Sequence, residues 1–285
     1  MFVTTATALR IERAEAQLTR AVAEAALASG HAPRAFVSTL GVGGGSYVRP
    51  GSPFNKLIGV GLVAPIDEAA LTRVEQELRA RGEPTRIELA TLASLESIAW
   101  LSQRGYRLLG FENVLVRSLS DPAATHASSI RVERATAATR AAWRETVVRA
   151  SSCSDETGVV VDQFSGELIA EAIDDMLRAG GFDRYLAYLD GALAGAASLY
   201  LCDKIALLSG SATLPAQRRR GVQAALIAAR LDEARARGAE LAVITTAPGS
   251  QSQANVMKHG FALAYARAIL VAPCELESVN REARV

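Results

Sequence analysis

Three consecutive arginines at 218–220 stand immediately before Gly221, and they are the residues best placed to hold an anion. An apolar run at 205–208 precedes them, and an alanine-, leucine- and arginine-rich helical pattern follows to about residue 237. The first N–H groups of a helix lack intrahelical partners, and the helix dipole favours negative charge there. Guanidinium groups add charge-assisted hydrogen bonds to phosphate, and glycine lets the backbone approach closely. The pattern predicts a pyrophosphate site, with a basic turn before a surface helix as the alternative.

The elements around this segment follow from hydrophobic periodicity and from the glycine, proline and serine residues between periods. The first half of the chain reads as a helix, three strands, a helix, a strand, a helix and a strand. The second half reads as a strand, two helices, three strands, a helix, a strand, a helix and a strand. The predicted helices are 8–29, 67–81, 94–104, 137–150, 164–179, 222–237 and 250–258, and the predicted strands are 34–40, 45–49, 56–63, 85–90, 106–117, 130–135, 184–190, 193–201, 205–213, 240–246 and 261–271.

The two halves carry similar residues at a nearly constant offset. The matched pairs, 155 or 156 residues apart, are Ala69–Leu71 with Ala224–Leu226, Arg79–Gly82 with Arg235–Gly238, Gly105–Tyr106 with Gly260–Phe261, and Leu115–Val116 with Leu270–Val271. Matches in this order along the same series of helices and strands indicate a duplicated unit. The stretch 118–129 is small and polar, which is typical of a linker. We therefore expect one domain at 1–117 and a second at 130–285.

The segment of the first half that corresponds to the arginine turn is Val63–Glu68. It has no arginine, it contains Pro65 without an N–H, and it brings Asp67 and Glu68 to a helix start. Carboxylates at that position stabilise the helix and repel phosphate. We therefore expect the first domain to lack a coenzyme site.

Composition argues against several function classes. Lys and Arg (31) nearly balance Asp and Glu (30), so a general binder of nucleic acid or of membrane surfaces is not indicated. Cys153, Cys202 and Cys274 lack C-x-x-C spacing, and the three histidines lack H-x-x-x-H spacing, so no disulfide framework and no metal site are expected. Because no apolar run reaches ~18 residues and no signal-peptide profile is present, we expect a cytoplasmic protein.

Two glycine-rich segments and one cysteine suggest other chemistry only weakly. Gly59–Ala64 matches G-x-G-x-x-A, but its glycines lie within the apolar run and Pro65 follows, which favours a closely packed strand over a dinucleotide site. Gly41–Ser46 lacks the Lys-Ser/Thr of a P-loop and predicts a hairpin turn, with the lining of an acceptor pocket as the alternative. Cys153 has no recognisable histidine partner, and the sequence has no G-x-S-x-G elbow.

Residues 130–271 resemble the GCN5-related N-acetyltransferase (GNAT) superfamily. The order of helices and strands is similar, and Arg218–Gln223 after Thr213–Pro215 resembles the family's [QR]-x-x-G-x-[GA] segment, with Gln223 in place of Gly or Ala. The stretch 252–261 resembles A-x-x-L-Y-x-K-x-G-F, but Val256 stands where the family often has a tyrosine that protonates the leaving thiolate. The first half, about 8–117, looks like a degenerate second copy. The resemblance implies an α/β (α+β) fold of two GNAT-like domains, each a mixed twisted sheet flanked by helices.

The resemblance also implies acetyl-CoA as cosubstrate, bound where the strands 205–213 and 240–246 splay apart and admit the pantetheine arm. The implied coenzyme-binding residues are Ser211, Ala212, Thr213, Arg218, Arg219, Arg220, Gly221, Val222, Gln223, Ser252 and Asn255. An acceptor amine would attack the thioester directly, which requires a base. The weak candidates for catalysis are Asp155, Glu156, Tyr200 and Tyr265, and a surface role is the preferred interpretation of each.

The expected function is an acetyl-CoA-dependent N-acetyltransferase acting on a primary amine of a small molecule or protein. A catalytically silent coenzyme-A-binding pseudoenzyme is one alternative, suggested by Val256 and the unassigned base. Another acyl- or aminoacyltransferase on the same fold is a second alternative, such as the peptidoglycan-bridge type, which also has tandem GNAT-like domains. The expected partners are acetyl-CoA and an amine, with no nucleic acid, membrane or metal, and a homodimer stays open.

Overall fold

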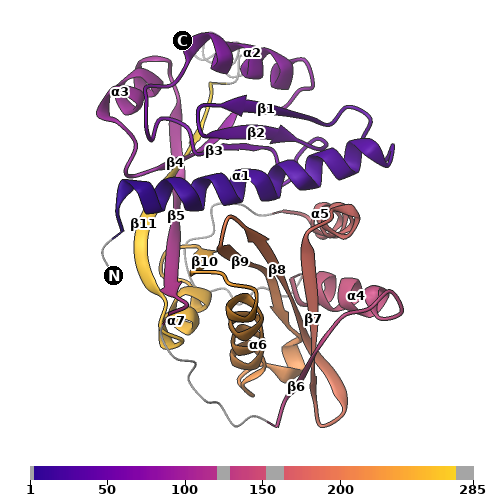
Figure 1. Ribbon diagram of the computed structural model, residues 1–285. Coiled ribbons are helices and arrows are strands. Elements are labelled where there is room, and N and C mark those ends of the chain that lie inside the picture. The colour runs from indigo at the N-terminus through magenta and orange to yellow at the C-terminus, as the bar shows by residue number, and fades with distance from the viewer. Residues whose placement is uncertain (1–2, 121–128, 152–163, 274–285) are drawn as a thin grey trace, which may run out of the picture. The chain divides into compact units, whose positions relative to one another are not determined.

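The computed structural model describes residues 3–120, 129–151 and 164–273 (Figure 1). The chain forms two compact units. The C-terminal unit is built from Asn113–Ala264, and the N-terminal unit from Val3–Glu112 together with the segment that starts at Tyr265. No helix in the described part of the chain is long and apolar enough to cross a membrane.

The last strand of each half of the sequence contributes to the unit built mainly by the other half. In the C-terminal unit, Asn113–Ser118 of β5 (Arg107–Ser118) pairs antiparallel with β10 (Leu241–Thr246). In the N-terminal unit, Arg267–Val271 of β11 (Ala262–Val271) pairs antiparallel with β4 (Arg86–Ala90). The expected division into 1–117 and 130–285 instead keeps each strand with its own half, and residues 121–128 of the proposed linker lie outside the described residues.

The C-terminal unit has strand order β5-β10-β9-β8-β7-β6, in which β9 and β10 are parallel and the other neighbours antiparallel. Helix α6 packs against one face of this sheet over a core that includes Leu199, Leu208 and Leu226. Helices α4 and α5 cover the other face (Figure 1), around Trp143 and Ile173. Its further elements are β6 (Arg131–Arg134), α4 (Arg140–Ser151), α5 (Gly166–Arg178), β7 (Phe182–Leu189), β8 (Ala192–Cys202), β9 (Ile205–Thr213), the short 3-10 helix η1 (Pro215–Gln217), α6 (Val222–Ala236) and α7 (Gln251–Lys258).

The N-terminal unit repeats this plan with fewer elements. Its strand order is β1-β2-β3-β4-β11, and the β3–β4 pair is parallel like β9–β10. The core gathers Leu57, Leu71, Leu78, Ile87 and Leu101. Its elements besides β4 and β11 are α1 (Thr5–Ala28), β1 (Phe36–Leu40), β2 (Gly43–Tyr47), β3 (Lys56–Ile58), α2 (Glu68–Arg79) and α3 (Leu95–Gln103).

The predicted mixed fold with helix-flanked sheets is confirmed. Of two predictions for glycine-rich segments, one is correct and one is partly wrong. The hairpin predicted at Gly41–Ser46 forms, with Leu40 opposite Gly43 and Gly41 at φ 58° in the turn. The strand predicted at 56–63 is wrong beyond Ile58, because Gly59 and Gly61 take φ 74° and 72°, which leaves the extended region.

Candidate functional site

The parallel strands β9 and β10 separate before they end. Ile205–Leu207 pairs with Leu241–Val243 and the pairing stops there, although β9 continues to Thr213 and β10 to Thr246. Parallel strands bring their carboxyl ends to the same edge of the sheet, so both free stretches lie on one side. The edge of β9 that faces the gap, which includes Ser211, carries backbone groups that an extended ligand can satisfy.

A one-residue bulge in β9 lies at the start of this gap. Ser209 faces Ser198 and Ala212 faces Ala196, so Gly210 and Ser211 both stand opposite Ala197. Gly210 has φ 58°, and a Cβ there would lie 2.9 Å from Ser198 Oγ. A bulge bends its strand and re-aims the residues that follow it. The bulge lies within the unpaired stretch of β9, three residues beyond Leu207.

The helix start beyond β9 is left open. After η1 the chain turns through Arg219 at φ 61° and Gly221 at φ 85° into α6. Gly221 is the N-cap residue, no side chain caps the helix, and the first turn of α6 contains no acidic residue. The first N–H groups of a helix carry partial positive charge, so this end of α6 suits an anion.

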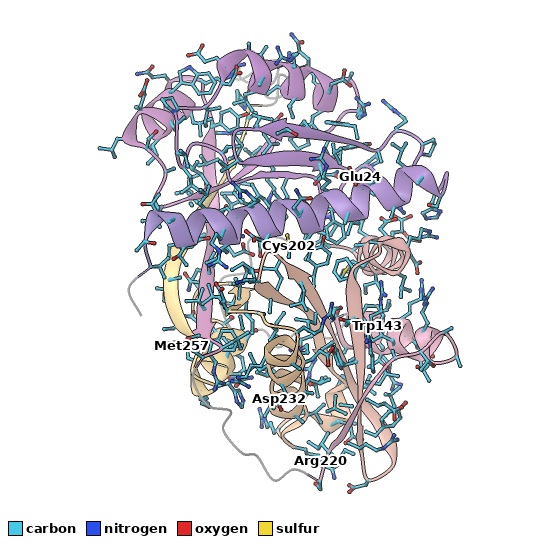
Figure 2. All side chains as sticks on the ribbon, in the orientation of Figure 1. Glu24, Trp143, Cys202, Arg220, Asp232 and Met257 are labelled. Carbon is cyan, nitrogen blue, oxygen red and sulfur yellow. The ribbon has the colours of Figure 1, made fainter. Side chains whose placement is uncertain are left out.

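Three arginines directly precede this helix start in the chain. Arg220 (Figure 2) donates through Nη1 to Gln217 Oε1 at 2.7 Å and through Nη2 to Asp190 Oδ2 at 2.7 Å. Its side chain is 47% exposed and that of Asp190 is 70% exposed, so the ion pair contributes little and can be exchanged for a stronger anion. Arg219 is exposed and Arg218 half-buried. The predicted pyrophosphate-binding residues 218–223 thus form a turn, 218–221, that leads directly into the first residues of α6.

Helix α7 is joined to the start of α6 by a chain of amide side chains. Asn255 Nδ2 donates to Gln223 Oε1 at 2.7 Å, and Gln251 Nε2 donates to Asn255 Oδ1 at 2.8 Å. Gln223, the residue that departs from the family pattern, is thereby engaged with α7. Ser252, the other predicted coenzyme residue on this helix, is exposed.

The candidates for catalysis are scattered. Asp155 and Glu156 lie outside the described residues. Tyr200 is half-buried on β8, and its ring centroid lies 5.0 Å from that of Phe182. Tyr265 belongs to the N-terminal unit, where it is 5% exposed and donates to Glu12 Oε1 at 2.6 Å. Burial, reinforced by the Glu12 charge, raises the pKa of Tyr265, so this phenol is a poor base.

Val256 packs into the core of the C-terminal unit. It is 1% exposed and belongs to the same apolar cluster as Leu226 and Phe261. At the position where the GNAT resemblance predicts a proton-donating tyrosine, this chain therefore has a valine that packs in the core. A tyrosine at this place would overpack the core unless α7 shifted.

The corresponding region of the N-terminal unit is closed by its own residues. Glu12 Oε2 accepts from Gly59 N at 3.1 Å just beyond the end of β3, and Ser94 N donates to Gly61 O at 2.9 Å. The carboxylate of Asp67 caps α2 by accepting from Ala70 N at 2.9 Å. Backbone N–H groups at the end of β3 and at the start of α2 thus have side-chain acceptors within the N-terminal unit. At the corresponding places in the C-terminal unit, β9 has no strand neighbour on one edge and α6 has no side-chain cap.

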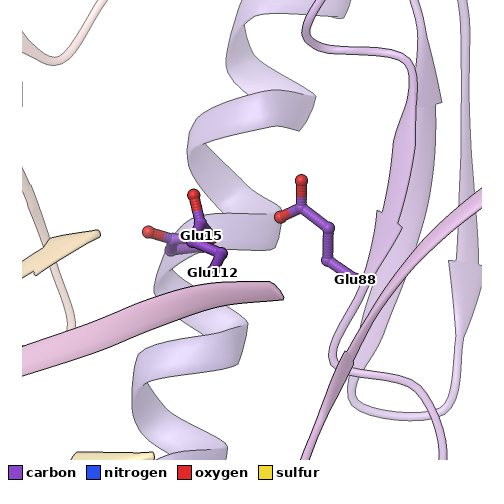
Figure 3. A group of neighbouring side chains, drawn as sticks. All are labelled: Glu15, Glu88 and Glu112. Atoms are coloured by element: carbon purple, nitrogen blue, oxygen red, sulfur yellow. The ribbon is translucent and has the colours of Figure 1, made fainter. Parts of the chain in front are cut away.

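A partly buried ionic cluster in the N-terminal unit is the main feature that the sequence did not reveal. Carboxylate oxygens of Glu15, Glu88 and Glu112 lie within 4.8 Å of one another (Figure 3). Each of these carboxylates forms an ion pair with a basic side chain. Lys56 Nζ lies 3.0 Å from Glu88, and Arg267 Nη1 lies 2.6 Å from Glu15 and 3.0 Å from Glu112. These residues come from five separate elements, so no local spacing marks them, and their arrangement is that of an ionic network.

Comparison with known proteins agrees with this geometry. Residues 149–261 match the family model described as acetyltransferase (GNAT) family. A GCN5-related N-acetyltransferase from Kribbella flavida has a similar structure, with 17% identity, a TM-score of 0.62, and coverage of 89% of this chain and 96% of that one. A tandem GNAT protein from the clavulanic acid biosynthesis pathway is similar at 13% identity and a TM-score of 0.52, covering 73% of this chain and 70% of that one.

A third structure, a GCN5-related N-acetyltransferase from Sphaerobacter thermophilus, gives 15% identity and a TM-score of 0.51, with coverage of 71% of this chain and 66% of that one. No curated protein sequence matches the chain significantly. The structural neighbours share the fold, and the family match lies on the unit that has the open strand gap and the uncapped helix start. Residues 149–261 therefore match a family of acetyltransferases, and the chain shares its fold with the structural neighbours.

Proposed function

We propose that the protein is an acetyl-CoA-dependent N-acetyltransferase that binds one coenzyme molecule, in the C-terminal unit, and acetylates a primary amine. The observation that carries this proposal is the combination of the β9–β10 gap with the uncapped start of α6. The first suits an extended amide-bearing arm and the second suits a pyrophosphate. The equivalent groups of the N-terminal unit are occupied by Glu12 and Asp67.

In this proposal the backbone of Ser211, Ala212 and Thr213 pairs with the pantetheine arm. The N–H groups of Gly221, Val222 and Gln223, with the three preceding arginines, hold the pyrophosphate. Ser252 and Asn255 line the site from α7. The residues fit the group, because the free edge of β9 and the start of α6 offer backbone donors that lack partners from secondary structure.

The reaction would join the amine nitrogen to the acetyl carbon, break the carbon–sulfur bond, and release one proton from the nitrogen. Holding both reactants in one site supplies a large part of such an acceleration. The thiol of coenzyme A has a pKa of ~8.5, so its thiolate is an adequate leaving group at neutral pH, even though Val256 cannot donate a proton. An amine must first lose its proton, so the rate should rise with pH and fall little above the optimum.

The test begins with calorimetric titration of the purified protein with acetyl-CoA, where we expect a stoichiometry near one. Free thiol is then followed while a panel of amines is supplied. Thiol release that depends on an amine supports the transferase. Tight coenzyme binding without thiol release from any amine would favour the silent pseudoenzyme, and a stoichiometry of two would contradict the assignment of one site.

A further inference from the structure

Arg230 places a buried positive charge in the core of the C-terminal unit. It lies on α6 and is only 1% exposed. Among the described residues no carboxylate pairs with it, and burial lowers its pKa to about 9, so it remains charged at neutral pH. A buried charge without a counter-charge is unfavourable unless hydrogen bonds compensate for lost hydration. The contacts of Arg230 should therefore indicate what it does.

All these contacts are to neutral oxygen atoms, and most lie on β8 and β9. Arg230 Nη1 donates to Ser198 O at 3.0 Å and to Ser209 O at 3.5 Å, and Nη2 donates to Ser211 Oγ at 3.4 Å. The remaining donor, Nε, bonds Leu226 O within α6 at 2.9 Å. Ser198 and Ser209 are the opposed residues on one side of the β9 bulge, and Ser211 is inside it. The guanidinium thus spans the irregularity in the β8–β9 ladder.

Trp143, on α4, contacts the β8 residue that lies opposite the β9 bulge. The Trp143 side chain, labelled in Figure 2, is fully buried, and its Nε1 donates to Ala197 O at 3.0 Å. Ala197 is the residue that faces the bulge. Because α4 and α6 pack on opposite faces of the sheet, the bulge is fastened from both sides. A bulge disturbs ladder hydrogen bonds, and these two side chains supply the donors that buried carbonyl groups require.

We propose that Arg230 and Trp143 are positioning residues of the coenzyme site, which fix the β9 bulge and so keep the gap between β9 and β10 open. This inference rests on the proposed function, because the gap is taken as the entrance for pantetheine. Leu207 is the last residue of β9 that pairs with β10, and the bulge follows at Gly210. The course of Ser211–Thr213 is therefore set at the bulge. Without the two donors, buried carbonyl groups would lose their partners, and β9 would shift to regain them.

The first experiment measures coenzyme A binding by calorimetry, well below the melting temperature of each variant. Arg230→Met keeps a long apolar side chain and removes every donor, and we expect the dissociation constant to rise about tenfold or more. Arg230→Lys retains the charge and one donor group, and should recover part of this loss. Arg235→Met is the matched control, because Arg235 also lies on α6 and donates Nε to a carbonyl, that of Leu119, at 3.2 Å. This control should bind like the wild type.

The second experiment is amide hydrogen exchange over 207–213 without ligand, which reports on the bulge whether or not the protein acts on an amine. Arg230→Met and Trp143→Phe should each speed exchange there about tenfold, and Arg235→Met should not. Wild-type affinity and wild-type exchange in folded Arg230→Met and Trp143→Phe would overturn the inference. If the wild type bound no coenzyme A while Arg230→Met still accelerated exchange, the proposed function would fail, and with it the coenzyme role of the bulge. Equal losses of affinity in Arg230→Met and Arg235→Met would show a general effect on α6 and would also overturn it.

Discussion

The starts of α6 and α2 occupy corresponding places in two units of one plan, and they differ in what satisfies their N–H groups. Helix α6 begins after Gly221 with no side-chain cap. Helix α2 begins after Asp67, whose carboxylate accepts from Ala70 N, and Glu68 follows in its first turn. An intramolecular carboxylate therefore stands where a phosphate would bind. The difference teaches that a duplicated fold closes a ligand site when its own side chains satisfy the groups that a ligand would need.

The strand pairs extend this comparison. Beyond the paired part of β9 the chain runs on for six residues to Thr213, whereas β3 ends at Ile58 and Gly59 N binds Glu12. The N-terminal unit is thus closed at two independent places, one at the helix start and one at the strand end. A change at either place alone should affect stability without creating a second coenzyme site.

The largest expected effect on coenzyme binding comes from giving α6 the acidic cap of α2. Gly221→Asp should weaken coenzyme A binding by at least about 100-fold, because a carboxylate would replace the phosphate at the helix start and would repel it. Calorimetry provides the measurement. Gly221→Ala is the control, since a Cβ there meets only Ile130 Cδ1 at 3.6 Å while φ is 85°, so it reports backbone strain without charge. Equal losses in the two variants would assign the effect to strain.

The largest expected effect on stability should follow removal of the carboxylate that closes the β3 end. Glu12 is fully buried and also accepts from Arg267 Nε at 2.8 Å, so Glu12→Ala should cost about 3–5 kcal/mol in the free energy of unfolding. Glu24→Ala on the same helix removes an exposed pair with Arg20 and should change it by less than about 1 kcal/mol. Urea unfolding of both variants measures the difference. If folded Glu12→Ala bound a second coenzyme molecule, the Asp67 cap of α2 would not be sufficient to keep coenzyme out of the N-terminal unit.

A smaller effect concerns pH and the ionic cluster. Burial, then the Glu88 charge, raises the pKa of Glu112 to about 7. The native state then binds a proton more tightly than the unfolded state, so stability from this group is present at acidic pH and is lost as pH rises toward and through 7. Glu112→Gln does not titrate, so its stability relative to the wild type should increase between pH 5 and 8.

We expect a change on the order of 1–2 kcal/mol, at the lower end of what such a shift allows, because the Glu112 side chain keeps 22% exposure and solvent screens its charge. Denaturant unfolding at several pH values gives the difference between the two proteins. A difference that stays constant from pH 5 to 8 would show that Glu112 does not take up the proton.

The smallest expected effect is at the cap of α2 itself. Asp67→Ala should lower the free energy of unfolding by about 1 kcal/mol through loss of the hydrogen bond to Ala70 N. Asp67→Asn keeps an acceptor and should stay close to the wild type. The coenzyme stoichiometry should remain one in both variants, since the end of β3 is still closed. A second bound coenzyme in Asp67→Ala would mean that the cap alone excludes it.

Features with a local cause were predictable from the sequence. The helices expected from about 67, 94 and 250 do begin beside Asp67, Ser94 and Ser250, whose side chains cap them. The arginine turn before Gly221 was also recognisable, because its residue types and its place before a helix pattern are contiguous. The exchange of β5 and β11 between the units was not, since hydrophobic alternation marks a strand without naming its neighbour.

Features that depend on packing had no sequence signal. Arg230 lies four residues after Leu226 and four before Ala234, on the buried face of α6, but this spacing does not show which carbonyl groups its guanidinium contacts. Val256 could be recognised as a departure from a family pattern, but its burial depends on how α7 packs. Glu12 and Arg267 are 255 residues apart, so only the completed fold brings them together.

The exchanged strands also set an order of events during synthesis on the ribosome. The N-terminal unit is translated first, yet its sheet waits for Arg267–Val271, which leaves the ribosome last among its strands. Until then, Arg267 is not available to the carboxylates of Glu12, Glu15 and Glu112, and the edge of β4 lacks that neighbour. The nascent N-terminal unit therefore stays incomplete until the C-terminal unit has emerged. A ribosome that stops before codon 265 releases a chain in which neither the first sheet nor its charge balance is complete.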